Sequence, residues 1–107
     1  MASPTAQVSE MIDAAVSFLG KRLSLSAVVL FGSQASGQAH EWSDIDLGVF
    51  TPNAEGLTFL DRVRLATELQ MACGFELEPH FFPEWALHDP PKGSFAEYII
   101  KTGKRIV

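Results

Sequence analysis

The apolar positions of the chain recur with helical spacing in some segments and with strand spacing in others. Side chains three and four residues apart predict an amphipathic helix over residues 6–22, and two further helices are predicted over residues 57–72 and 94–102. Residues 27–31 are continuously apolar and rich in valine, which is typical of a strand buried on both faces. The residues available for the buried side of the second helix are Leu57, Leu60, Val63, Leu65, Leu69 and Ala72.

Two more strands are predicted at residues 44–50 and 75–82, and residues 104–107 fit a terminal strand. In the strand over 75–82, apolar residues alternate with polar ones, beginning at Phe75, so one of its faces is expected to be buried. The intervening segments are expected to be a short helical turn at 34–39, a polar loop at 40–43 and a loop with one turn at 83–91. Because helices alternate with strands, the pattern predicts one α/β domain over residues 1–107, with helices packed on a small sheet.

The composition and charge of the chain exclude several classes of protein. The chain has 107 residues, of which 47% are hydrophobic, so it can form one domain with a buried core. Its longest apolar run is Ala27–Phe31, too short to span a membrane, and it opens without a secretion signal, so we expect a cytoplasmic protein. The single cysteine, Cys73, excludes an internal disulfide and a four-cysteine zinc site. The net charge of −5 argues against general binding to nucleic-acid backbones.

Gly32 and Ser33 follow the first predicted strand and precede a predicted helical turn. A glycine at the end of a strand lets a ligand approach the backbone, and the start of a helix offers N–H groups to an anion. The Ser33 hydroxyl adds a further donor. The pair fits an anion-binding turn, with an ordinary turn as the alternative because both residues are common in turns.

Asp44 and Asp46 are two residues apart in the second predicted strand. Alternate side chains of a strand share a face, so both carboxylates are expected on one face and the apolar residues of this strand on the other. Carboxylates held side by side repel each other unless a cation lies between them, and their oxygens suit Mg²⁺. We therefore predict a metal site, with two solvated aspartates as the alternative. Gly48, on the same face, is expected to leave space beside the pair.

A third carboxylate is expected from the next predicted strand. If that strand lies beside the aspartate strand, Glu78 completes a cluster with Asp44 and Asp46, because paired strands lie about 4.8 Å apart. Glu76 shares the same face and is the alternative. We favour Glu78, since the residue before a proline is held extended. Pro79 also predicts that this strand lies at a sheet edge, because proline has no N–H to donate.

Several other residues are interpreted first as structural. His80 shares the face of Glu78 and is interpreted as a surface residue, with contact to a phosphate or an acceptor as the less favoured alternative. For His40 and Trp42 the less favoured alternative is contact with a base or a partner, and Trp42 is otherwise interpreted as a partly buried anchor. Three aromatic residues at or just after the third strand are interpreted as part of the core and its rim; they are Phe81, Phe82 and Trp85. Because the edge of this strand is expected to be unprotected, we predict an apolar surface there that binds a partner.

Gly32-Ser33, ten intervening residues and the Asp44-x-Asp46 pair resemble the signature of the DNA polymerase beta-like nucleotidyltransferase superfamily. The small size of the chain is similar to that of the branch called minimal nucleotidyltransferases, and the resemblance covers nearly the whole chain. It implies a small mixed β-sheet flanked by helices.

The resemblance also implies a reaction and a role for each site residue. The Gly32 backbone and Ser33 would hold the terminal phosphates of a nucleotide. Asp44, Asp46 and Glu78 would bind two Mg²⁺ ions as the catalytic carboxylates. A hydroxyl would attack the α-phosphorus of ATP or another nucleoside triphosphate, and pyrophosphate would leave.

The chain departs from the family pattern in two places. Ser36 stands where many minimal members carry an arginine, which bears on triphosphate binding. The third carboxylate, Glu78, is commonly an aspartate, which bears on the geometry of the metal site.

Minimal members similar to this chain are commonly paired with a small all-helical protein of the HEPN class. In such toxin–antitoxin pairs the nucleotidyltransferase is the antitoxin and transfers AMP to its partner. The resemblance therefore implies an acceptor hydroxyl on a HEPN-type partner protein, and a homodimer is also compatible with it. Two alternatives are transfer to a small molecule such as an aminoglycoside, and a non-catalytic binding module.

Overall fold

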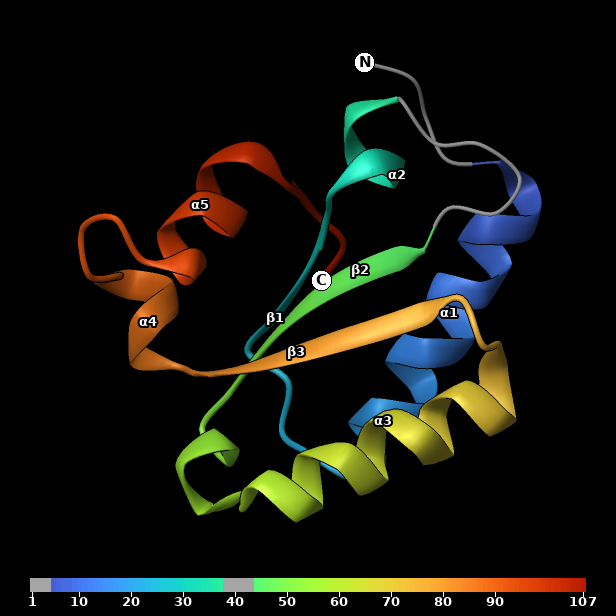
Figure 1. Ribbon diagram of the computed structural model, residues 1–107, viewed down its shortest axis with the longest axis horizontal. Helices are drawn as coiled ribbons and strands as arrows, with labels where there is room; N and C mark the ends of the chain where they lie inside the picture. The colour runs from blue at the N-terminus through green and yellow to red at the C-terminus, as the bar shows by residue number, and fades with distance from the viewer. Residues whose placement is uncertain (1–4, 38–43) are drawn as a thin grey trace.

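The computed structural model of the protein describes residues 5–37 and 44–107. Its elements, in chain order, are α1 (Ala6–Gly20), β1 (Ala27–Phe31), α2 (Ser33–Ser36), β2 (Ile45–Thr51), the 3-10 helix η1 (Ala54–Gly56), α3 (Phe59–Cys73), β3 (Leu77–Pro83), α4 (Trp85–His88), α5 (Phe95–Thr102) and β4 (Lys104–Arg105). The strands form one sheet in the order β3-β2-β1-β4 (Figure 1). β1 is antiparallel to β2 and β4, whereas β2 and β3 are parallel. The predicted mixed sheet flanked by helices is confirmed, and β3 is an edge strand.

Helices cover both faces of the sheet. α1 and α3 pack on one face, and α4 and α5 pack on the other (Figure 1). Because side chains alternate along a strand, Leu47 of β2 belongs to the core beneath α1 and α3, whereas Phe50 belongs to the core beneath α4 and α5. Within residues 5–37 and 44–107, no helix has the length and apolar character that crossing a membrane requires.

Each of the three longer helices begins at a capping hydroxyl. The side chains of Thr5, Thr58 and Ser94 accept hydrogen bonds from backbone N–H groups three residues later. At α3, Asp61 also accepts from the Thr58 N–H at 2.9 Å, which completes a capping box. α1 begins at Ala6, as predicted, but ends at Gly20 rather than at residue 22. The caps place the start of α3 two residues and the start of α5 one residue after the predicted ones.

The predicted buried side of α3 is partly wrong. Leu65 and Leu69 are buried, but Leu60 is 56% exposed and Val63 is 43% exposed. The apolar residues of this helix form more than one stripe, and the sheet covers only the stripe that contains Leu65 and Leu69. Phe75 is also exposed, because β3 begins only at Leu77.

Alternate backbone groups of β3 point away from the sheet. The Ile45 N–H donates to the Glu76 carbonyl at 2.7 Å, so the even-numbered residues of this segment pair with β2. The residues whose backbone groups face outward are Leu77, Pro79 and Phe81. Pro79 has no N–H to offer at this edge, which removes one site at which another strand could pair.

Side chains from α3 cover the same edge. Gln70 donates to the Leu77 carbonyl at 2.9 Å, and Arg62 donates to the carbonyls of Phe81 and Ala54 at 2.8 Å each. The expectation of an unprotected edge is therefore partly wrong, because two outward carbonyls already have donors.

Candidate functional site

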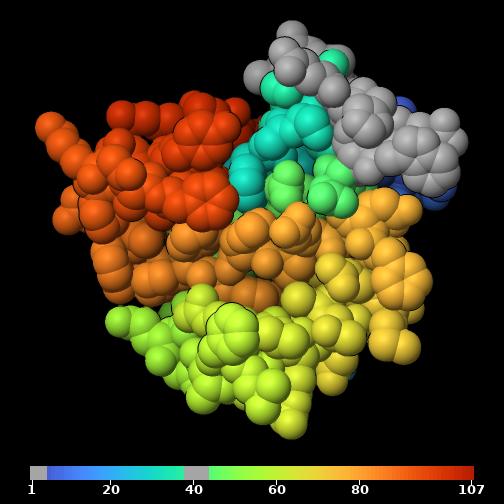
Figure 2. All heavy atoms as spheres, viewed as in Figure 1, coloured from blue at the N-terminus to red at the C-terminus, as the bar shows by residue number. Residues whose placement is uncertain are grey.

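The strand register gathers the predicted site residues at one end of the sheet. Asp46 lies opposite Phe31 at the end of β1 and opposite Glu78 on β3. Gly32 and Ser33 follow Phe31 directly, so the turn at the end of β1 meets the start of β2. In Figure 2, α2 (cyan), the start of β2 (green), β3 (orange) and α5 (red) meet on the face in view.

Three side chains converge at this end. Asp46, Glu78 and His80 each offer a ligand atom, and these atoms lie within 4.8 Å of one another. His80 Nε2 is 3.9 Å from Asp46 Oδ1. Asp44 lies one residue before β2, is exposed and is not a member of this group.

Glu76 lies away from the cluster. Its carboxylate is next to Gly74, where an added Cβ would be 3.2 Å from Glu76 Oε2. Of the two glutamates, the register therefore brings Glu78, not Glu76, level with Asp46.

The pKa of Asp46 is raised above its usual value. The main cause is partial burial, and the negative charge of Glu78, a hydrogen bond to Glu78 and the charge of Asp44 act in the same direction. The nearby His80 acts in the opposite direction. Asp46 is thus a carboxylate whose negative charge the protein only partly compensates.

The donor atoms of the cluster fit a divalent cation. Two carboxylates from neighbouring strands supply hard oxygen ligands, and a cation between them would offset their repulsion. The imidazole of His80 is a better ligand for transition metals than for Mg²⁺. The part of the cluster that suits Mg²⁺ is therefore the pair of Asp46 and Glu78.

Gly32 lies against the Asp46 carboxylate. It has φ +75° and ψ −153°, a conformation adopted almost only by glycine. A Cβ added there would be 2.6 Å from Asp46 Oδ2. Gly32 is therefore required both by its backbone conformation and by the close approach of the carboxylate. Its carbonyl accepts from the N–H groups of Ala35 and Ser36, at 3.1 Å each, as α2 begins.

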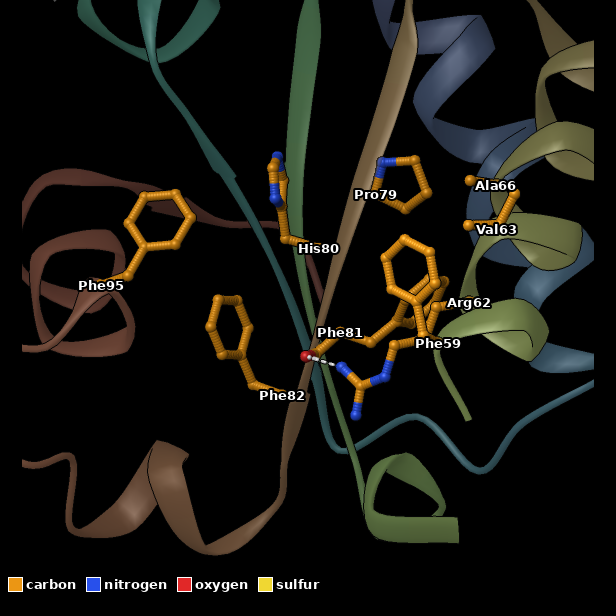
Figure 3. A pocket seen from close by; sticks show the side chains of 9 residues that line it. All are labelled: Phe59, Arg62, Val63, Ala66, Pro79, His80, Phe81, Phe82 and Phe95. Carbon is orange, nitrogen blue, oxygen red and sulfur yellow. Dashed lines mark hydrogen bonds between the residues drawn. The ribbon is translucent and has the colours of Figure 1, made fainter. Parts of the chain in front are cut away.

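Two open pockets border the cluster. The first, of about 390 Å³, is lined by Gly32, Ser33, Ser36, Tyr98 and Thr102. The second, of about 370 Å³, includes His80 and lies around the outer edge of β3 (Figure 3). In this view His80, Phe82 and Phe95 lie on the α5 side of the strand, and Phe59 lies on the α3 side. The lining of the second pocket is Phe59, Arg62, Val63, Ala66, Pro79, His80, Phe81, Phe82 and Phe95.

The apolar surface at this pocket differs from the predicted one. Phe81 is buried and Phe82 is partly buried, so Trp85, at 51% exposure, is the most exposed of the predicted aromatic group. Phe59 and Phe95 are instead exposed at the pocket.

Gly48 does not leave open space beside the aspartates. A Cβ added there would be 3.0 Å from Cγ2 of Ile99, so α5 occupies that space. α5 in turn brings Phe95, Tyr98 and Thr102 to the two pockets, which the sequence interpretation missed. Their spacing on one side of a short amphipathic helix was the only signal. His40 and Trp42 lie outside the described residues.

A family model described as "Polymerase beta, Nucleotidyltransferase" matches residues 14–107. The chain belongs to this nucleotidyltransferase family. The range that the polymerase beta family model matches includes the signature identified in the sequence. It also includes every residue of the cluster.

Two solved structures share the fold of this nucleotidyltransferase chain. One is a crystal structure of a toxin–antitoxin with AMP-PNP, with a TM-score of 0.62 and 24% identity, and the match covers 87% of this chain and 69% of that one. The other is a protein from Sulfolobus solfataricus provisionally assigned as a nucleotidyltransferase, with a TM-score of 0.52 and 19% identity over 86% of each chain. Among proteins with curated descriptions, none matches the chain.

Proposed function

We propose that the protein is a Mg²⁺-dependent nucleotidyltransferase that moves AMP from ATP to a hydroxyl group on a partner protein. The observation that carries this proposal is the Asp46–Glu78 pair beside Gly32, in a chain of the polymerase beta nucleotidyltransferase family. The partner would be a small helical protein of the HEPN class, and this chain would be the antitoxin of the pair. The structural likeness to a toxin–antitoxin with AMP-PNP supports that choice.

Each site residue has a role in this proposal. The backbone at Gly32 and the hydroxyl of Ser33 bind the terminal phosphates. Asp46 and Glu78, together with Asp44, would hold Mg²⁺, which neutralises charge on the entering and leaving oxygens when bound. The acceptor oxygen bonds to the α-phosphorus, the bond from the α-phosphorus to the oxygen bridging to the β-phosphorus breaks, and pyrophosphate leaves. The exposed carboxylate of Glu78 receives the proton of the acceptor hydroxyl.

The pocket at the edge of β3 supports an acceptor carried by a protein. It touches the cluster through His80 and is mostly aromatic and aliphatic. Its described lining includes no acidic side chain, and its one guanidinium, on Arg62, donates to backbone carbonyls. A polycationic aminoglycoside would require acidic side chains at such a pocket, so this lining favours an apolar protein segment.

Radiolabelled ATP tests the proposal. The purified chain is incubated with Mg²⁺ and a candidate partner, a small helical protein encoded next to it, which we call the neighbouring protein. We expect label from [α-³²P]ATP to appear on that protein, and no label from [γ-³²P]ATP. Glu78→Gln should abolish the transfer, whereas Glu76→Gln, the same change at a glutamate that lies away from the cluster, should preserve it.

Two outcomes favour the alternatives. Labelling of an aminoglycoside instead of the protein would identify a small-molecule transferase. Tight binding of the neighbouring protein without transfer of label, unchanged by Glu78→Gln, would identify a non-catalytic binding module.

A further inference from the structure

The pocket beside Gly32 has an unusual lining for a site that would receive a triphosphate. Of the five described residues that line it, four carry a hydroxyl group and none carries a positive charge. The four are Ser33, Ser36, Tyr98 and Thr102. Charge on a phosphate at this pocket must therefore be met by hydroxyl and backbone donors, together with any bound cation.

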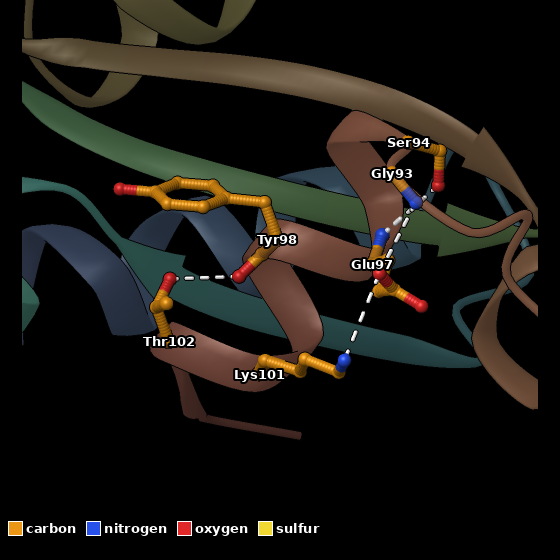
Figure 4. Close-up of polar contacts among 6 residues, drawn as sticks. All are labelled: Gly93, Ser94, Glu97, Tyr98, Lys101 and Thr102. Carbon is orange, nitrogen blue, oxygen red and sulfur yellow. Dashed lines mark hydrogen bonds and ion pairs between the residues drawn. The ribbon is translucent and has the colours of Figure 1, made fainter.

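The nearest lysine of α5 is engaged elsewhere. Lys101 Nζ is 3.7 Å from Glu97 Oε1, one turn earlier on the helix. Figure 4 shows Lys101 reaching toward Glu97 while the ring of Tyr98 extends in another direction. The side of α5 that faces the pocket is therefore supplied by Tyr98 and Thr102 rather than by a cation.

The hydroxyl groups of the pocket differ in where their protons point. Thr102 Oγ1 donates to the Tyr98 carbonyl at 2.7 Å, and Ser36 Oγ donates to the Ser33 carbonyl at 3.3 Å. These two hydroxyls thus direct their protons to the backbone. Within the described residues, the hydroxyl of Tyr98 donates no hydrogen bond, and no contact reaches it in Figure 4. Tyr98 is 53% exposed. Tyr98 is available as a donor to a bound ligand.

Packing fixes the position of Tyr98 relative to the cluster. Its ring stacks on Phe95 with centroids 6.3 Å apart and an interplanar angle of 16°. Phe95 in turn makes an edge contact with Phe31, at 5.5 Å, and Phe31 immediately precedes Gly32. Ile99, which packs against Gly48, fixes the rotation of the same helix. The ring of Tyr98 is therefore held in place at the pocket that Gly32 also lines.

We infer that Tyr98 is a nucleotide-binding residue whose hydroxyl donates a hydrogen bond to the terminal phosphates of the bound triphosphate. The inference rests on the proposed function. It assigns to α5 a donor at the pocket that Ser33 also lines, and it explains how a pocket whose described lining residues include no cation holds the leaving group. The contact acts on the β- or γ-phosphate, so it should distinguish ATP from AMP.

Calorimetry with AMP, ADP and ATP in the presence of Mg²⁺ tests this inference on the full chain. Tyr98→Phe keeps the ring and its stacking on Phe95 but removes the donor. We expect it to weaken binding of ATP about tenfold, to weaken ADP less and to leave AMP unchanged. Trp85→Leu is the matched control, because it removes another half-exposed aromatic side chain and should leave all three affinities unchanged. Circular dichroism confirms that each variant is folded.

The outcomes separate this inference from the proposed function. If the wild-type chain binds ATP and Tyr98→Phe binds it equally tightly, the inference is wrong and the proposed function stands. If Tyr98→Phe has no effect but Tyr98→Leu weakens AMP, ADP and ATP equally, Tyr98 stacks on the base, which also overturns the inference. If the wild-type chain does not bind ATP at all, both the inference and the proposed function are wrong.

Discussion

Replacing Gly32 with alanine should disturb the site in two separable ways. The backbone conformation, with φ +75° and ψ −153°, is one that an alanine adopts only with strain. The new methyl group would also lie 2.6 Å from Asp46 Oδ2, well inside contact distance. The Asp46 carboxylate must then move, although Glu78 and Asp44 already repel it.

The expected loss in the free energy of unfolding follows from these two effects. Strain at such a conformation costs about 1–3 kcal/mol of the free energy of unfolding. Gly93 provides a control for the positive φ, because it has φ +78° and an added Cβ would have nothing within 4 Å. Gly93→Ala should therefore cost about 1–2 kcal/mol. Gly32→Ala should cost more than this, because only Gly32 also has the contact with Asp46.

Urea unfolding of four proteins isolates the contact. These are the wild type, Gly32→Ala, Asp46→Ala and the double variant. We expect the double variant to be less destabilised than the sum of the single changes, by about 0.5–3 kcal/mol, because Asp46→Ala removes the atom that the methyl group meets. Strict additivity, with Gly32→Ala no more destabilising than Gly93→Ala, would refute the claim that Gly32 supports the Asp46 carboxylate.

Two further predictions concern the elements that support the site. The Thr58 N–H, and to a lesser degree the Thr58 hydroxyl, lower the pKa of Asp61 in the folded state. The charge of Asp61 therefore stabilises the folded state fully above the unfolded pKa of about 3.9, and this stabilisation is lost as the pH falls through the lower pKa of the folded state. Urea midpoints should therefore fall less steeply with acid in Asp61→Asn than in the wild type, and parallel curves would contradict this. Arg62→Met removes two hydrogen bonds to backbone carbonyls and should cost about 1.5–3 kcal/mol in urea unfolding. The exposed control Arg64→Met should cost little, and equal losses would show that Arg62 does not support the β3 edge.

The acidic pair could be predicted because its determinants are local. Strand alternation placed Asp46 and Glu78 on faces set by the apolar residues around them, and Pro79 indicated an edge strand. A parallel pairing of these two strands then leaves few registers that bring a glutamate level with Asp46. Of the two glutamates, Glu76 lies at the point where β3 has not yet begun.

Other parts of the site depend on contacts between distant segments. The face of α3 that packs on the sheet could not be chosen from spacing alone, so Leu60 was wrongly expected to be buried. His80 approaches Asp46 only because it pairs with Gly48 in the parallel register. Tyr98 reaches the Gly32 pocket only because α5 crosses the sheet at Gly48. No local pattern specifies these contacts.

The most direct test of the central claim is calorimetry of ATP binding with and without Mg²⁺. We predict that the wild type and Glu76→Gln bind ATP with the same affinity and only when Mg²⁺ is present. Asp46→Asn and Glu78→Gln should remain folded and bind about tenfold more weakly or not at all. If both variants bind Mg²⁺ and ATP as tightly as the wild type, or if wild-type binding is unaffected by removal of Mg²⁺, the assignment of the metal and nucleotide site is wrong.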